Sequence, residues 1–205
     1  MKFILGKKEK MSQIFAEDGK VFPVTIVSAG PIVVTQVKSA DKDGYEAIQV
    51  GYGEKKEKNI NKAIKGHLKG KGNFSVLREV RNNKGISSAK EGDIMDISMF
   101  EVGDKVEVIG ITKGKGFQGV VKRHGFHGGP RSHGQKHSER EPGSIGATGP
   151  QRVFKGTKMG GRMGGNRVTV KNLKIIAIDK DNNKIAIKGA IPGRRGTLLE
   201  IKGMG

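Results

Sequence analysis

The feature that most limits how this chain can fold is a basic, glycine-rich segment near its middle, residues 113–172. This segment holds 13 lysines and arginines but only two acidic residues, Glu139 and Glu141. Its few large apolar residues follow neither the strand period nor the helix period. Such a stretch cannot bury enough apolar surface by itself to offset the entropy lost on ordering. We therefore expect it to be irregular, extended and ordered mainly by what it binds.

The overall charge indicates the class of partner. The 205 residues include 39 lysines and arginines against 20 acidic residues, a net charge of +19, and more than half of this excess lies in residues 113–172. An excess of this size favours a polyanionic partner. The alternative, a disordered basic linker, is disfavoured because phenylalanine, methionine and arginine are spaced among the glycines.

Cysteine content and hydropathy exclude several other classes. The chain has no cysteine, so disulfides, thiolate zinc sites and cysteine nucleophiles are excluded. The amino-terminal apolar block, Phe3–Leu5, is far shorter than a signal peptide, and no run approaches the roughly 18 apolar residues of a membrane span. We therefore expect a soluble cytosolic protein.

The sequence on either side of the basic segment is rich in β-branched residues. Turn signals bound six runs that predict strands: Val21–Val27, Pro31–Val37, Tyr45–Tyr52, Lys105–Thr112, Arg167–Asp179 and Lys184–Gly189. Pro23 places the first run at a sheet edge or a bulge. Short strands in this order predict an all-β barrel or sandwich. Between them, a helix over Asn59–Gly70 and a strand over Phe74–Val80 predict a small α/β insert.

Residues Gly114–Gly119, GKGFQG, have the glycine spacing of a dinucleotide-binding turn. Such a turn needs a helix after its third glycine, because the helix amino terminus receives the pyrophosphate. Four glycines and a proline soon after Gly119 argue against a helix of useful length there. We therefore disfavour a nucleotide-dependent enzyme and expect no cofactor.

Four histidines within fifteen residues suggest a metal site: His124, His127, His133 and His137. A zinc site would need four such ligands, and nearby arginines and lysines create a field that opposes a dication. We expect these histidines to contact nucleic acid and no metal to bind. Ser132, His133 and Glu139 resemble a hydrolase trio, but no nucleophile elbow presents them, so we expect no catalytic residues.

Glycine interleaved with basic residues suits contact with phosphate. Glycine lets the backbone approach a polyanion closely, arginine binds phosphate with two parallel hydrogen bonds, and lysine supplies a mobile charge. Arg152–Lys171 combines all three. The sequence contains no recognition helix, KH-type clamp or aromatic RNA-binding box, and aromatic residues are only 5% of the chain. These features predict phosphate and shape recognition of a structured RNA.

Residues Phe100–Arg123, FEVGDKVEVIGITKGKGFQGVVKR, resemble the signature of the third large-subunit ribosomal protein family. The matching positions are Phe100, Gly110, Thr112, Gly114, Lys115, Gly116, Gly119 and Arg123. Glu107 stands where the family usually has Asp or Asn. The resemblance continues through RSHG (131–134), PGSIG (142–146), RVFKGTKMGGRMG (152–164), RVTVKNL (167–173) and GKKEKMSQIFAEDG (6–19). It spans essentially the whole chain and favours a bacterial member.

The resemblance implies a mainly β fold with three parts. These are a six-stranded closed barrel of the translation-protein type, a small α/β insert and a long irregular basic loop. The expected divisions are residues 1–58 (barrel, first part), 59–98 (insert), 99–124 (barrel strand and loop entry), 125–165 (rRNA-penetrating loop) and 166–205 (barrel, last part).

The resemblance also implies a structural, non-enzymatic component of the large ribosomal subunit in the cytoplasm. Its expected partners are large-subunit (23S-type) rRNA and neighbouring ribosomal proteins, with no membrane and no small-molecule substrate, and it is expected to be a monomer within the ribosome. It would nucleate early subunit assembly and support the region of the peptidyl transferase centre through its loop. The alternative with the same charge pattern is a free RNA chaperone or translational regulator outside the ribosome.

Two sets of site residues follow from this resemblance. The loop tip near the peptidyl transferase centre is expected at Gly143, Ser144, Ile145 and Gly146. The residues expected to bind rRNA are Lys113, Lys115, Lys122, Arg123, His124, His127, Arg131, His133, Lys136, His137, Arg140, Ser144, Arg152, Lys155, Lys158, Arg162, Arg167 and Lys171.

Overall fold

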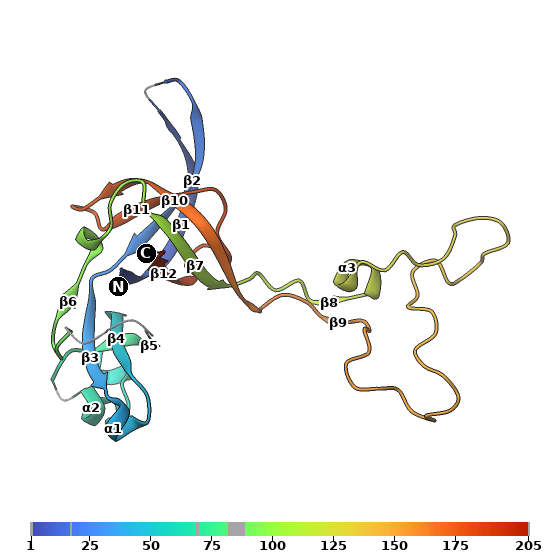
Figure 1. Cartoon of the computed structure of the whole chain (residues 1–205), viewed down its shortest axis with the longest axis horizontal. Coiled ribbons are helices and arrows are strands. Elements are labelled where there is room, and N and C mark those ends of the chain that lie inside the picture. The colour runs from blue at the N-terminus through green and yellow to red at the C-terminus, as the bar shows by residue number, and fades with distance from the viewer. Residues whose placement is uncertain (1, 17, 69, 82–88, 205) are drawn as a thin grey trace. The chain divides into compact units, whose positions relative to one another are not determined.

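The computed structural model describes residues 2–16, 18–68, 70–81 and 89–204, and its fold is mainly β (Figure 1). The chain divides into two compact units: Met1–Ile111 with Arg167–Gly205, and Thr112–Asn166. In the part of the chain that the structure describes, every helix is too short or too polar to cross a membrane.

Six antiparallel strands of the first unit form a closed ring of hydrogen-bonded neighbours (Figure 1). In ring order they are β1 (Phe3–Phe15), β12 (Leu198–Gly203), β7 (Lys105–Ile111), β10 (Arg167–Asp179), β11 (Lys184–Lys188) and β2 (Val21–Ala29). The side chains of β12 alternate as expected for a strand with one buried face. Ile185 and Ile187 of β11 and Leu199 and Ile201 of β12 are completely buried.

A second, four-stranded sheet lies in the same unit. Its strands in order are β5 (Phe74–Val80), β4 (Ala47–Glu54), β3 (Ile32–Lys38) and β6 (Ile94–Met95). The sequence analysis grouped β3 and β4 with the barrel strands, but here they pair with each other and with β5 and β6. A β-branched run indicates a strand without indicating its partner, because pairing depends on residues distant in the sequence.

Short helices connect these strands. They are α1 (Ala40–Asp43), η1 (Glu57–Asn59), α2 (Lys62–Leu68) and η2 (Ile97–Met99). The helix α2 lies inside the predicted range 59–70 and begins after Asn61, whose side-chain oxygen accepts a hydrogen bond from the Ile64 N–H at 2.9 Å. Asparagine is a favoured residue at this capping position, which accounts for where the helix starts.

One hydrophobic core runs through both sheets. Ile4, Leu5, Val108 and Leu199 from the ring belong to the same buried cluster as Ile32, Val34 and Val50 from the four-stranded sheet, and as Phe100. Burial of this continuous apolar surface accounts for the two sheets forming one unit.

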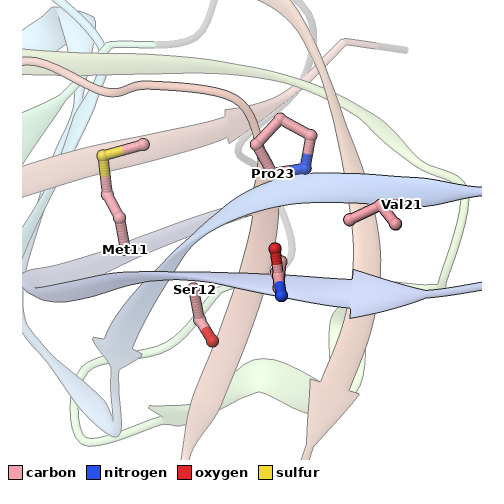
Figure 2. Close-up of a pocket in the computed structure, with 5 residues that line it drawn as sticks. Met11, Ser12, Val21 and Pro23 are labelled. Atoms are coloured by element: carbon pink, nitrogen blue, oxygen red, sulfur yellow. The ribbon is translucent and has the colours of Figure 1, made fainter.

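The β1–β2 hairpin continues past the end of β11. Strand β11 pairs with β2 from Ser28 to Val24, and the Gly189 N–H just after β11 donates to the Pro23 carbonyl oxygen at 2.8 Å. Pro23 therefore lies where the pairing on this side of β2 ends and the hairpin edge begins, in agreement with the predicted edge position. Figure 2 shows Met11, Ser12, Val21 and Pro23 around a shallow pocket on this hairpin.

Candidate nucleic-acid interface

The two ends of the second unit lie side by side. The Thr112 N–H donates to the Asn166 carbonyl oxygen at 2.9 Å, and the Lys115 N–H donates to the Met163 carbonyl oxygen at 2.9 Å. Two short strands continue the pairing: β8 (Phe117–Gln118) and β9 (Gly161–Arg162). The GKGFQG segment and the GGRMGG segment therefore form a narrow antiparallel ribbon (Figure 1).

The glycines of this ribbon have different structural roles. Gly164 has a φ of 79°, and a Cβ atom there would lie 2.2 Å from the Lys113 carbonyl oxygen, so no other residue fits. Gly116 also has a positive φ, 68°. Gly114 and Gly119 have neither constraint, because a Cβ atom on either would meet nothing within 4 Å. The fold of the chain does not require glycine at these two positions.

Only a single helical turn follows Gly119, which agrees with the expectation that no helix of useful length would form there. The helix α3 (Val120–His124) has five residues and ends at Gly125, whose left-handed φ of 74° stops it. The five residues after Gly119 contain no glycine or proline, which permits one turn. A single turn has too few aligned peptides for a strong dipole, so the argument against a dinucleotide site remains.

Two residues predicted to bind rRNA instead contact the chain itself. The Arg123 guanidinium donates to the Met159 carbonyl oxygen at 2.7 Å, and His124 Nε2 lies 3.0 Å from the same oxygen. Both side chains are half-buried. Arg123 and His124 therefore join the beginning of the unit to a segment some 35 residues later.

The remaining predicted basic residues of this unit are exposed. They are Lys113, Lys115, Lys122, His127, Arg131, His133, Lys136, His137, Arg140, Arg152, Lys155, Lys158 and Arg162. Among the residues that the structure describes, only Arg131 of this set forms an ion pair, with Glu139 at 3.7 Å. The other lysines and arginines of the set present their charges to solvent without a protein counter-ion in the described chain.

Apart from His124, the four histidines lie on this exposed part of the chain, as do Ser132, His133 and Glu139, the residues that resemble a hydrolase trio. The Gly129 N–H donates to the Glu139 carbonyl oxygen at 3.1 Å and closes a turn that carries Ser132 and His133. The carboxylate of Glu139 pairs with Arg131. Within the described ranges, no cluster of three or more His, Asp or Glu residues is arranged to hold a metal ion.

The predicted loop tip is exposed and open. Ser144 Oγ donates to the Gly146 carbonyl oxygen at 2.9 Å, which fixes a tight turn. The tip lines a shallow concavity, formed by Gly143, Ser144, Ile145, Gly146, Ala147, Thr148, Gln151, Arg152 and Val153.

The last two predicted residues belong to strand β10 of the first unit. Arg167 pairs with Glu200 at 2.7 Å, so part of its charge is already neutralised, whereas Lys171 is exposed. Sequence reasoning missed an exposed pair in the turn between β11 and β12, Arg194 and Arg195. The signal that could have found it is the run PGRRG, two arginines between glycines.

The exposed cations and glycine-lined backbone of residues 112–166 are features typical of proteins that bind a polyanion through an extended segment. Comparison with known proteins identifies the family: the model for "Ribosomal protein L3" matches residues 87–203. The chain belongs to the ribosomal protein L3 family.

Bacterial relatives resemble the chain over nearly its whole length. It is 50% identical to "Large ribosomal subunit protein uL3" of Syntrophobacter fumaroxidans, over 98% of this chain and 97% of the relative. The proteins of the same name from Carboxydothermus hydrogenoformans and Streptococcus pyogenes serotype M1 are also 50% identical, each over 98% of this chain and 96% of the relative.

Proposed function

We propose that this protein is a structural constituent of the large ribosomal subunit and that residues 112–166 bind large-subunit rRNA directly. The observation that carries the proposal is the set of exposed lysines and arginines in this unit, which lack carboxylate partners among the described residues apart from Arg131. Phosphate groups are the counter-ions that such a surface suits. Family membership and the names of the relatives support the same assignment. Bacterial ribosomes lie in the cytoplasm, where we place this protein.

The finer architecture is part of the proposal. The six-stranded ring is proposed to be a barrel of the translation-protein type. The small insert is proposed at residues 59–98, which supply α2, β5 and β6, the last two pairing with β4 and β3 of the four-stranded sheet. Residues 125–165 would enter the rRNA, with residues 143–146 at the tip near the peptidyl transferase centre. We further propose that the protein acts early in subunit assembly, as a monomer beside other ribosomal proteins and without catalytic residues of its own.

The proposed contacts fall into two groups. The exposed side chains would bind phosphates directly. Arg123 and His124 would hold together the two arms of the segment, residues 113–140 and 152–167, through the Met159 carbonyl oxygen. The direct contacts are Lys113, Lys115, Lys122, His127, Arg131, His133, Lys136, His137, Arg140, Ser144, Arg152, Lys155, Lys158, Arg162, Arg167 and Lys171.

The salt dependence of rRNA binding tests this proposal. The double change Lys155→Ala and Arg162→Ala should reduce the slope of log K against log salt by roughly 0.7 to 0.9 for each lost phosphate contact. Binding to a transcript of large-subunit rRNA is measured over a series of KCl concentrations. Lys56→Ala with Lys58→Ala is the charge-matched control, because both lysines are exposed in the first unit and lie outside the proposed interface.

If the slope of log K against log salt is the same for the Lys155 and Arg162 variant as for the parent protein, these two side chains do not contact phosphates. Co-sedimentation addresses the ribosomal assignment separately. The protein should travel with large subunits in a gradient. A protein that binds the transcript but stays at the top of the gradient would be a free RNA-binding regulator instead.

The glycines that the fold does not require provide another prediction. Gly114→Ala should leave the thermal stability unchanged, because its Cβ would meet no atom of the chain within 4 Å. It should weaken rRNA binding by about 10-fold or more, the effect of losing one hydrogen bond to a charged group when the backbone is held away from phosphate. The measurements are thermal unfolding and transcript affinity.

The matched control is Gly66→Ala in the helix α2. This position is also open, so the same change should leave rRNA affinity unchanged and stabilise the helix by about 0.5–1 kcal/mol. If Gly114→Ala binds rRNA as tightly as the parent protein, the backbone at residue 114 does not approach phosphate.

A further inference from the structure

Phe117 is an exposed aromatic residue on an ordered strand. Its side chain is 79% exposed, the largest fraction among the large apolar side chains of the described chain. It lies on β8, where pairing with β9 fixes the backbone. A phenylalanine that served only the stability of the fold would be buried, because burial of an aromatic ring stabilises a protein and exposure does not.

The other phenylalanines of the same unit have partners within the chain. The ring of Phe126 packs against His124, with the ring centroids 6.1 Å apart. The ring of Phe154 has the Arg152 guanidinium 5.7 Å from its centroid. Phe117 has no such ring or cation partner among the described residues. Arg162 stands opposite it in the β8–β9 pairing, and Gly160 lies at the edge of its ring, where a Cβ atom would be 3.4 Å away, so no side chain covers that edge from residue 160.

Two cations lie near Phe117 along the ribbon. Arg162 stands opposite Phe117 in the β8–β9 pairing, and Lys115 lies two residues before it. Both side chains are exposed, and neither has a carboxylate at ion-pair distance in the ranges that the structure describes. An exposed apolar ring on a ribbon that also carries exposed cations is complementary to a nucleotide, whose base is flat and apolar on its faces and whose phosphates are negative.

We propose that Phe117 stacks on an unpaired nucleobase of the bound RNA, with Lys115 and Arg162 on the phosphates beside that base. This inference rests on the proposed function, which assigns contacts with the phosphate backbone of the RNA. It adds a contact with a base. It also adds to the sequence-based expectation, in which phosphate and shape recognition supply most of the affinity. The flanking cations favour RNA over an apolar pocket of a protein neighbour as the occupant, because such a pocket would have to desolvate them.

Affinity measurements with conservative variants test the stacking. Phe117→Leu keeps an apolar side chain but removes the flat ring, and it should weaken binding to the large-subunit rRNA transcript by about 5- to 150-fold. Because no charge is lost, the salt slope should stay unchanged. Phe117→Tyr retains the ring and should bind within a few-fold of the parent protein. Phe15→Leu, which alters a 66% exposed phenylalanine on the β1–β2 hairpin, is the control for lost apolar surface.

A fluorescent variant reports the contact directly. The chain contains no tryptophan, so Phe117→Trp introduces a single one. Stacking of a base on the indole should quench its fluorescence when the transcript is added. The tryptophan variant should also retain affinity, since indole stacks at least as well as phenyl.

The outcomes separate this inference from the proposed function. If Phe117→Leu binds the transcript as tightly as the parent, or if Phe117→Trp is not quenched on binding, the stacking is wrong. In that event a reduced salt slope in the Lys155 and Arg162 variant would leave the rRNA-binding function standing. If neither the Phe117 variants nor the charge variant affects binding, the proposed function itself fails. Because residue 117 is exposed, thermal unfolding of each variant should match the parent, which excludes misfolding as the cause of an affinity loss.

Discussion

Replacing Phe100 by alanine should lower the free energy of unfolding by about 3–5 kcal/mol, the usual cost of emptying a phenylalanine site in a packed core. Phe100 is 1% exposed and belongs to the cluster shared by the ring and the four-stranded sheet. It follows the short helix η2, and its N–H donates to the Ile97 carbonyl oxygen at 3.1 Å. The cavity left by alanine would therefore lie in a core that both sheets share. Denaturant unfolding followed by circular dichroism measures the change.

Two comparisons make this prediction specific. Phe15→Ala removes an equally large side chain that is 66% exposed, and its effect should stay within about 0.5 kcal/mol. The Phe100→Ala protein, kept below its unfolding temperature, should bind the rRNA transcript as tightly as the parent, because a buried ring cannot contact RNA. A loss of stability below about 1 kcal/mol would show that the site collapses around the smaller side chain.

The sequence predicted most individual strands, but not the sheets to which they belong. Arg167–Asp179 and Phe74–Val80 have the predicted boundaries, whereas the pattern does not predict β1 or β12. In β1 the charged run Lys7–Lys10 follows the buried Phe3–Leu5, because the strand leaves the core and continues into the hairpin. An alternating pattern requires one face to stay buried along the strand, and here it does not.

The local composition of the candidate site was predictable, while its long-range contacts were not. Glycine and charge indicated that residues 113–172 would be largely irregular, and residues 112–166 contain only two two-residue strands and one five-residue helix. The contacts of Arg123 and His124 with Met159 could not be predicted, because nothing local distinguishes a basic residue that binds a distant carbonyl group from one that faces solvent. The two kinds of basic residue differ only once the two arms pair and bring Met159 beside Arg123 and His124.

Gly164→Ala should open the base of the proposed rRNA-binding segment while leaving the first unit folded. The substitution combines two costs: a non-glycine residue at a φ of 79°, about 1–2 kcal/mol, and a Cβ atom 2.2 Å from the Lys113 carbonyl oxygen, about 1–3 kcal/mol once the backbone moves apart. The local stability of the ribbon should therefore fall by about 2–5 kcal/mol. Hydrogen exchange of the Lys115 and Met163 amides, which bond across the ribbon, reports that local opening.

Gly165→Ala separates the two costs. Gly165 has a similar φ of 72°, but a Cβ atom there would approach only the end of the Arg162 side chain, at 3.8 Å. It should lose only the conformational part, about 1–2 kcal/mol. If hydrogen exchange accelerates equally in both variants, the close approach to Lys113 is not what holds the ribbon. If Gly164→Ala alone also weakens rRNA binding strongly, the pairing of the two arms is what places their cations on the RNA, since neither substitution removes a charge.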